Sequence, residues 1–373
     1  MGKRKDCIIT DRNGIIENRH EVHVAVIDSD TGRLLYSVGD PSRITLTRSA
    51  AKPAQALAVL ETGALEQFGF DEADLALMCA SHNSEERHLS RARSMLARVP
   101  GAREAHLRCG GHPALLESVN RTWIKNDFVP TAVCNNCSGK HVGMLAGAKA
   151  IGAGFEDYHL PTHPIQIRVK SVVRELSGSN STTCKWGIDG CNLPAPALPL
   201  HLMAKLYGAF ATAAGIENSK ETKPREKALA RIFNSMTQYP ELVGGEGRFC
   251  TTLMEAYEGR LIGKVGAEGC YGVGIRASED TRRLGASGAI GVAVKIEDGN
   301  LGILYSAVAE ILEQLAIGTP EMRRKLDKFH KPAVLNTAGV ITGHTSHLFT
   351  LDSPEQGCFE QGIDGSAVFV GNT

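Results

Sequence analysis

Two serines and two lysines are the residues whose spacing is best suited to nucleophilic chemistry. Ser49 and Lys52 lie three residues apart in the segment RSAAKP, so one helical turn would place both side chains on one side. A serine hydroxyl needs a base to take its proton. A lysine amine can be that base if its pKa falls from about 10.4 to about 7–8. Taken alone, the motif favours a simpler alternative, an N-capping serine followed by an exposed lysine.

Two later segments add a second pair, Ser81 and Lys264. Ser81 follows the apolar stretch MCA and opens the triplet SHN, whereas Lys264 stands between glycines in GKVG on an expected strand. Each has a structural alternative: Asn83 and Glu86 fit a helix capping box, and Lys264 fits a lysine that protects a sheet edge. The order Ser-x-x-Lys, Ser-x-Asn, Lys-x-Gly is similar to that of serine β-lactamases and penicillin-binding proteins. Only 32 residues separate the first two motifs (81 − 49), which is short for those enzymes. We therefore expect acyl chemistry on a related scaffold.

A cysteine-rich segment, CNNCSGKH, is the densest group of soft metal ligands. It holds Cys134, Cys137 and His141, and Cys191 in the later segment GCN offers a third thiol. Cys-x-x-Cys with one further Cys or His is compatible with zinc, although no second pair is present. The alternative is a thioredoxin-like redox pair, which the lack of a βαβ context disfavours. The other cysteines are expected to be packing residues.

Composition and charge exclude several classes of protein. The 373 residues are 42% hydrophobic and 22% charged, which excludes disorder of the whole chain. With 41 basic and 41 acidic residues, no basic excess indicates nucleic acid or an anionic membrane surface as a partner. We expect no membrane span and no secretory signal, and ten cysteines fit a reducing, cytoplasmic setting.

The periodicity predicts an α/β (α+β) fold in which both ends of the chain share one antiparallel sheet. Strands are expected near residues 20–40 and 258–300, followed by a helix over 301–317, while residues 49–257 form a mainly helical lobe. The proline-punctuated segment 192–200 (NLPAPALPL) is expected to be a loop. Residues 1–343 are interpreted as a single catalytic unit, and 344–373 as an irregular tail.

Together these motifs resemble the rhizobial-type, or class 3, L-asparaginases, from about Ile8 to about Gly343. The segments that carry the resemblance are TRSAAKPAQ, MCASHNSEERH, LRCGGHP, VCNNCSGKHVGML, DGCNLPAPA, GGEGR and GKVGA. The resemblance implies hydrolysis of L-asparagine to L-aspartate and ammonia, a serine β-lactamase/glutaminase-like fold and a homodimer. It also implies two Ser–Lys tandems, Ser49 with Lys52 and Ser81 with Lys264. Finally, it implies a Zn²⁺ ion that supports substrate binding without activating water, held by Cys137, Lys140 and Cys191, with Cys134 not a direct ligand.

As a mechanism we expect Ser49 to attack the side-chain amide while Lys52 takes its proton. Ser81 and Lys264 would relay protons to the leaving ammonia and then assist the deacylating water. An amino-acid substrate needs charged partners for its carboxylate and its ammonium group. Candidates from the motif segments are Arg48, Asp189, Glu246 and Arg248. The alternatives are a glutaminase or another amidase on the same scaffold and, in a different class, a zinc-binding or thiol-redox protein.

Overall fold

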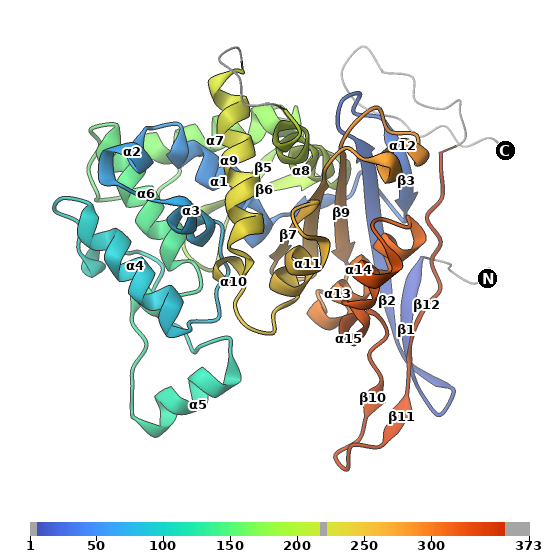
Figure 1. Ribbon diagram of the computed structural model, residues 1–373. Coiled ribbons are helices and arrows are strands. Elements are labelled where there is room, and N and C mark those ends of the chain that lie inside the picture. The colour runs from blue at the N-terminus through green and yellow to red at the C-terminus, as the bar shows by residue number, and fades with distance from the viewer. Residues whose placement is uncertain (1–5, 217–221, 355–373) are drawn as a thin grey trace.

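Strands from the two ends of the chain lie side by side in one antiparallel sheet (Figure 1). The computed structural model describes residues 6–216 and 222–354. The strand order is β12-β1-β2-β9-β8-β7, and β3 pairs with the second half of β2. The bounds are β1 Cys7–Arg12, β2 Ile15–Asp28, β3 Leu34–Val38, β7 Leu261–Gly266, β8 Cys270–Ile275, β9 Ile290–Ile296 and β12 Thr345–His347. The predicted fold class and the antiparallel sheet are confirmed.

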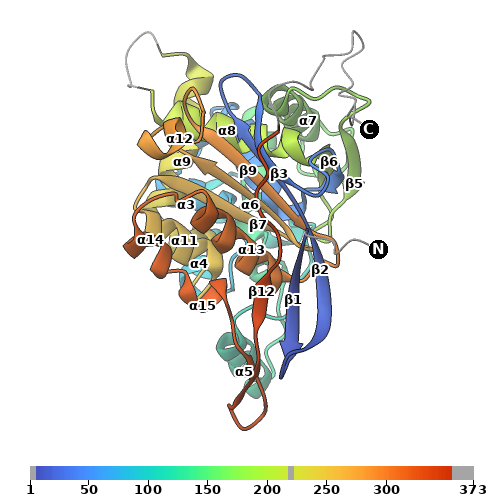
Figure 2. The same cartoon turned by 90° about the vertical axis from the view of Figure 1, so that its right-hand side faces the viewer.

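Helices cover both faces of this sheet (Figure 2), which explains why every residue of β7, β8 and β9 is buried. On β8, Tyr271 packs against Tyr305 of α13 (Leu301–Gln314). The next residue, Gly272, lies against Tyr207 of α8 (Leu200–Ala214). Successive side chains of a strand point to opposite faces, so α8 and α13 lie on opposite sides of the sheet. Lys264 is paired directly with Gly272 and therefore points to the α8 side.

The helical lobe packs beside the α8 face and holds the predicted motifs (Figure 1). Its helices are α1 Lys52–Leu60, α2 Ala64–Phe68, α3 Glu72–Met78, α4 Glu86–Arg98, α5 Glu117–Lys125, α6 Ser138–Ala150, α7 Pro164–Ser177, α9 Pro224–Gln238 and α10 Pro240–Val243. The next helix, α11 Phe249–Tyr257, lies on the α13 side of the sheet, where Phe249 stacks on Tyr305. Short 3-10 turns are η1 Arg48–Ala51, η2 Glu104–His106 and η3 Ala132–Cys134. The remaining elements are α12 Glu279–Arg283, α14 Pro320–Arg324, α15 Asp327–His330, β10 Val334–Leu335 and β11 Ile341–Gly343. Within the described ranges, every helix is too short or too polar to cross a lipid bilayer.

The segment 192–200, expected to be a loop, instead contains strand β6, Pro194–Pro199. It is the middle strand of a second small sheet, between β4 (Ile44–Leu46) and β5 (Lys185–Ile188). Pro194 and Pro196 are two residues apart, so their missing N–H groups face the same side of the strand. The carbonyl groups still accept hydrogen bonds, and the amide of Thr47 donates to Pro196 at 2.9 Å. The prolines hid this strand from the sequence pattern.

Strand structure also continues past residue 343, where an irregular tail was expected. β12 pairs with β1 through Ile8–His347, Ile9–Ser346 and Thr10–Thr345. Three residues are too few for an alternating pattern to predict a strand from sequence. Residues 355–373 of the expected tail lie outside the described residues.

Candidate active site

The hydroxyl of Ser81 lies between the amines of two buried lysines. Its Oγ atom is 3.0 Å from Lys52 Nζ and 2.7 Å from Lys264 Nζ. Both lysines have an exposed fraction of 0%, and that of Ser81 is 4%. Three of the four residues predicted to be catalytic therefore meet, although they come from α1, the segment after α3, and β7. Two amines this close to one hydroxyl form a proton-transfer network, because each can exchange a proton with the oxygen between them.

Lys52 is surrounded by oxygen acceptors. Besides Ser81, its amine donates to the carbonyl oxygen of Ala80 and, at 3.4 Å, to that of Asn136. Three acceptors match the three N–H donors of a lysine ammonium group. The geometry around Lys52 is thus suited to holding a positive charge.

Lys264 has a different environment, with two hydrogen-bonding partners. Its amine contacts Ser81 and donates to the carbonyl oxygen of Val265 at 2.8 Å. Burial, reinforced by the charge of Lys52, lowers the pKa of Lys264 to about 7. A neutral amine has two N–H groups and one lone pair, so it can donate to Val265 and accept the hydroxyl proton of Ser81. Lys264 is therefore the better general base of the two lysines at neutral pH.

Ser49 lies on η1, the turn that leads into Lys52. It is half-buried, and its hydroxyl has no hydrogen-bond partner within residues 6–216 and 222–354. Ser49 and Lys52, which were expected to act as a pair, are not hydrogen-bonded to each other, because the Lys52 amine is bonded to Ala80, Ser81 and Asn136 instead. The hydroxyl of Ser49 thus remains available to a substrate.

Two contacts hold η1 against the sheet. Tyr207 lies over Gly272, and its hydroxyl donates a hydrogen bond of 2.6 Å to the carbonyl oxygen of Ala50. A Cβ atom on Gly266 would lie 2.3 Å from the carbonyl oxygen of Thr47, so only glycine lets β7 approach the turn this closely. Sequence reasoning missed Tyr207, because a tyrosine in an amphipathic helix carries no signal of such a role.

The segment after Ser81 packs on the loop that carries two substrate-binding candidates, Glu246 and Arg248. The Ser81 amide donates to the carbonyl oxygen of Val243 at 2.9 Å, and the Asn83 side-chain amide to that of Glu246 at 3.3 Å. The other side-chain atom of Asn83, Oδ1, is buried without a partner. The Asn83–Glu86 capping box is not formed: Glu85 is the N-cap of α4, and its carboxylate accepts from the Glu246 amide at 2.9 Å.

A second buried cluster joins Cys137, Lys140 and Cys191. The Lys140 Nζ atom lies 3.0 Å from Cys191 Sγ, and the Cys137 thiol donates to Asn136 Oδ1 at 3.2 Å. The Cys137 thiol, followed by Lys140, lowers the pKa of Cys191 to about 5 despite burial. Burial alone would lower the pKa of Lys140, but the charges of the two cysteines and Asp189 together raise it. The arrangement is a thiolate–ammonium pair with a second thiol beside it, a donor set that suits a soft metal ion.

Arg48 and Asp189 connect this cluster to η1. The Arg48 Nε atom donates to Asp189 Oδ1 at 2.6 Å, while Asp189 Oδ2 lies 3.7 Å from the Sγ atom of Cys191. Arg48 has a φ of +49°, a left-handed conformation that costs a non-glycine residue ~1–2 kcal/mol. The Arg48–Asp189 ion pair thus holds a strained residue immediately before Ser49.

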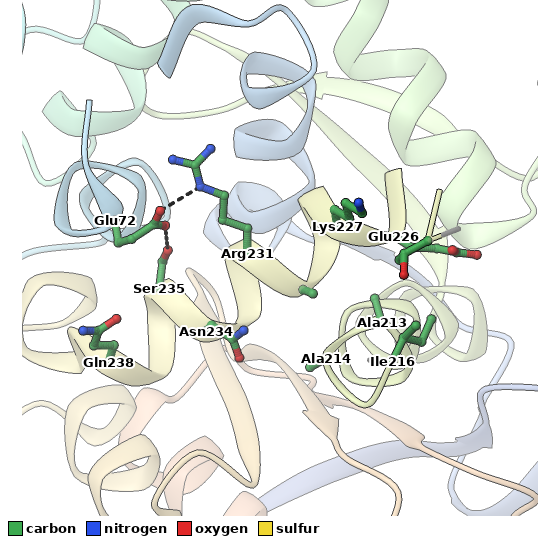
Figure 3. A pocket seen from close by; sticks show the side chains of 12 residues that line it. Glu72, Ala213, Ala214, Ile216, Glu226, Lys227, Arg231, Asn234, Ser235 and Gln238 are labelled. Carbon is green, nitrogen blue, oxygen red and sulfur yellow. Dashed lines mark hydrogen bonds and ion pairs between the residues drawn. The ribbon is translucent and has the colours of Figure 1, made fainter. Parts of the chain in front are cut away.

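An open surface cavity lies away from these clusters (Figure 3). It has a volume of about 350 Å³ and lies between α3, α8 and α9. Its lining includes the Glu72–Arg231 ion pair at 2.8 Å and Ser235, which donates to Glu72 at 2.6 Å. These side chains bond to one another, and no residue predicted from the sequence to be functional lines the cavity. Its chemistry does not compete with that of Ser81 and the two lysines.

Comparison with known proteins identifies the reaction class. The family model described as L-asparaginase II matches residues 8–347, which include the serine–lysine and cysteine–lysine clusters. No curated protein matches the chain. Because the family match covers nearly the whole sequence, this protein belongs to the L-asparaginase II family.

Proposed function

We propose that the chain hydrolyses L-asparagine to L-aspartate and ammonia through a serine acyl-enzyme, with Lys52 and Lys264 transferring the protons. The family supports the reaction. The observation that carries the mechanism is the Ser81 hydroxyl, which lies 3.0 Å and 2.7 Å from two buried lysine amines. A serine nucleophile needs a base that can take its proton at pH 7, and a buried amine whose pKa lies near 7 is such a base.

We assign the nucleophile to Ser49 and the proton relay to Ser81. Ser49 is the more exposed serine and its hydroxyl has no partner among the described residues, whereas Ser81 is enclosed by both amines. As Ser49 Oγ bonds to the side-chain amide carbon, its proton passes to the Ser81–lysine network. The amide nitrogen then takes a proton and leaves as ammonia. A water molecule attacks the ester, its proton returns through the same groups, and aspartate is released with the Ser49 hydroxyl restored.

The charged groups of the amino-acid substrate require partners of opposite sign near Ser49. Arg48 and Asp189 already form one such pair next to that serine. We propose that Arg48 takes the α-carboxylate and Asp189 the α-ammonium group, each exchanging one ionic partner for another. Glu246 and Arg248, on the loop that packs on Asn83, are the second set of candidates.

We further propose that Cys137, Lys140 and Cys191 hold Zn²⁺. Two buried sulfur atoms and one buried amine, with Lys140 Nζ 3.0 Å from Cys191 Sγ, form a suitable donor set, provided that the lysine proton is released on binding. A bound zinc ion would hold the Cys191 segment, and with it Asp189, in place and so support substrate binding. Cys134 is buried, and among the described residues its thiol contacts Thr131 at 4.0 Å, so we leave it out of the proposed donor set.

Ammonia release from L-asparagine and L-glutamine, measured side by side, tests the reaction. We expect turnover of L-asparagine; preferential turnover of glutamine would support the alternative amidase, since one methylene changes discrimination by only ~1–3 kcal/mol. S49A should release no ammonia above background and form no acyl-enzyme adduct in rapid-quench mass spectrometry. S81A should retain a slow adduct at position 49. An adduct at position 81 would reverse the two assignments.

A homodimer and a cytoplasmic location complete the proposal. The dimer rests on the resemblance to class 3 asparaginases, and the location on the cysteine content, with free buried thiols at nine described positions. One chain has a mass of 39.9 kDa, and sedimentation equilibrium should give twice that mass. A concentration-independent monomer would contradict the dimer.

A further inference from the structure

A cluster of two histidines and a glutamate joins three elements near the C-terminal end of the described chain. Glu310 lies on α13, His330 ends α15, and His347 ends β12. Glu310 Oε2 is 2.6 Å from His330 Nε2 and 3.2 Å from His347 Nδ1. The side chains are 15%, 14% and 3% exposed, respectively, so the cluster is largely enclosed but can be reached by solvent.

The positions of the protons in this cluster leave one buried nitrogen atom without a hydrogen-bond partner. Ser306 has a single hydroxyl proton and donates it to the carbonyl oxygen of His330. Its 2.8 Å contact with His347 Nε2 therefore requires a proton on that nitrogen. In a neutral imidazole the other nitrogen, Nδ1, then carries a lone pair, and this lone pair is buried without a hydrogen-bond partner.

The unsatisfied nitrogen faces a carboxylate oxygen, which is also an acceptor. His347 Nδ1 and Glu310 Oε2, 3.2 Å apart, would repel each other unless a proton or another cation lay between them.

We propose that Glu310, His330 and His347 bind a divalent transition-metal ion, with Zn²⁺ as the best match. Two imidazole nitrogens and one carboxylate oxygen are a common zinc donor set, and the potential ligand atoms lie within 4.8 Å of one another. Water would take the fourth position on the partly exposed side. The charge of the neighbouring Lys331 opposes a cation here, so the affinity should be lower than in a site without a lysine.

Neighbouring groups already orient two of the three ligands. Gln314 Nε2 donates to Glu310 Oε1 at 2.9 Å, leaving Oε2 for the ion, and Ser306 fixes the orientation of the His347 ring. Such outer contacts support metal ligands in proteins. The site is at the β12 edge of the sheet, whereas Lys264 lies on β7 at the opposite edge. The ion would therefore fasten β12 and α15 to α13 and take no part in hydrolysis.

Zinc stoichiometry of the full chain tests this site. We would dialyse metal-free protein against buffered Zn²⁺ and measure bound metal by mass spectrometry. The reference protein is C137S/C191S, which lacks the two cysteine ligands. It is compared with the same protein carrying H347Q and, as the matched control, with the same protein carrying H344Q. His344 is exposed and lies three residues before His347. C137S/C191S should bind one equivalent, and adding H347Q should weaken that binding by about 100-fold or more, whereas adding H344Q should not change it.

A thermal measurement covers the case in which the cysteine variant does not fold. Added Zn²⁺ should raise Tm, and the rise should increase with the Zn²⁺ concentration. In the otherwise unchanged chain, H347Q should lose one of two bound zinc equivalents, whereas H344Q should lose none. Equal stoichiometry and equal Tm shifts for H347Q and H344Q would overturn the proposal.

Discussion

Lys264 and Lys140 are both buried, yet their environments move their pKa values in opposite directions. Lys264 faces Lys52, a second cation, and its pKa falls to about 7. Lys140 faces two thiols and the Asp189 carboxylate, and its pKa rises above the ordinary value. Burial lowers the pKa of both amines, so the difference comes from their neighbours. In the metal-free protein, one fold thus prepares a proton acceptor at β7 and a positive charge on α6.

The largest effect should come from removing the proton acceptor. K264M keeps the length and apolar stem of the side chain but deletes the amine, so kcat for L-asparagine should fall by ~10²–10⁴-fold. K140M, the matched variant, should act mainly through substrate binding and raise KM with a smaller loss of kcat. Steady-state kinetics of both variants test the contrast. Equal losses of kcat would show that the two amines do not have distinct roles.

The pH profile gives the next effect. Lys264 must be neutral to accept a proton, so kcat/KM should fall about tenfold per pH unit below pH 7, where the amine becomes protonated. Lys140 should add no inflection there, because its pKa is raised. Rates measured from pH 5 to 9 test this. A flat profile across pH 6–8 would be inconsistent with Lys264 as the base.

Replacing each of the two lysines by methionine should change the free energy of unfolding in opposite directions. The folded-state pKa of Lys264 lies below the unfolded value, so the amine destabilises the fold fully below about pH 7 and progressively less as pH rises towards ~10.4. K264M should therefore raise the free energy of unfolding by ~1–3 kcal/mol at pH 6, allowing for the lost hydrogen bond to Val265. K140M should lower it by ~3 kcal/mol, because the Cys191 thiolate loses its partner. Urea denaturation at pH 6 and pH 9 measures both, and a destabilised K264M would contradict the account.

The smallest effect concerns the ion pair that precedes Ser49. R48K keeps the charge but cannot reproduce the guanidinium contact with Asp189, so KM should rise by ~10-fold with kcat little changed. Kinetics with L-asparagine check this, with R121K, an exposed arginine paired with Glu117 on α5, as the control. An unchanged KM for R48K would exclude a role for this pair in binding.

The sequence pattern predicted strands β2, β3, β7, β8 and β9 of the sheet but not β1 or β12. The family resemblance named the residues of the two clusters, but the pairing within them was not predicted. Alternating valines in β2 and β9 and the helical periodicity of α4 and α7 carry strong local signals, so these elements were expected. The contact of Lys52 with Ser81 in place of Ser49 depends on where α1 meets the end of α3, which local spacing does not encode. The support of η1 by Tyr207 is a long-range contact of the same kind.

The most direct test is to measure the pKa of each buried lysine. Lysines labelled with ¹³C at Cε can be followed by NMR from pH 5 to 11, with K264M and K140M used to assign the two resonances. The account predicts that the signal missing in K264M titrates near pH 7, and that the signal missing in K140M does not titrate below pH 10. A Lys264 resonance that titrates near pH 10.4 would contradict the central claim.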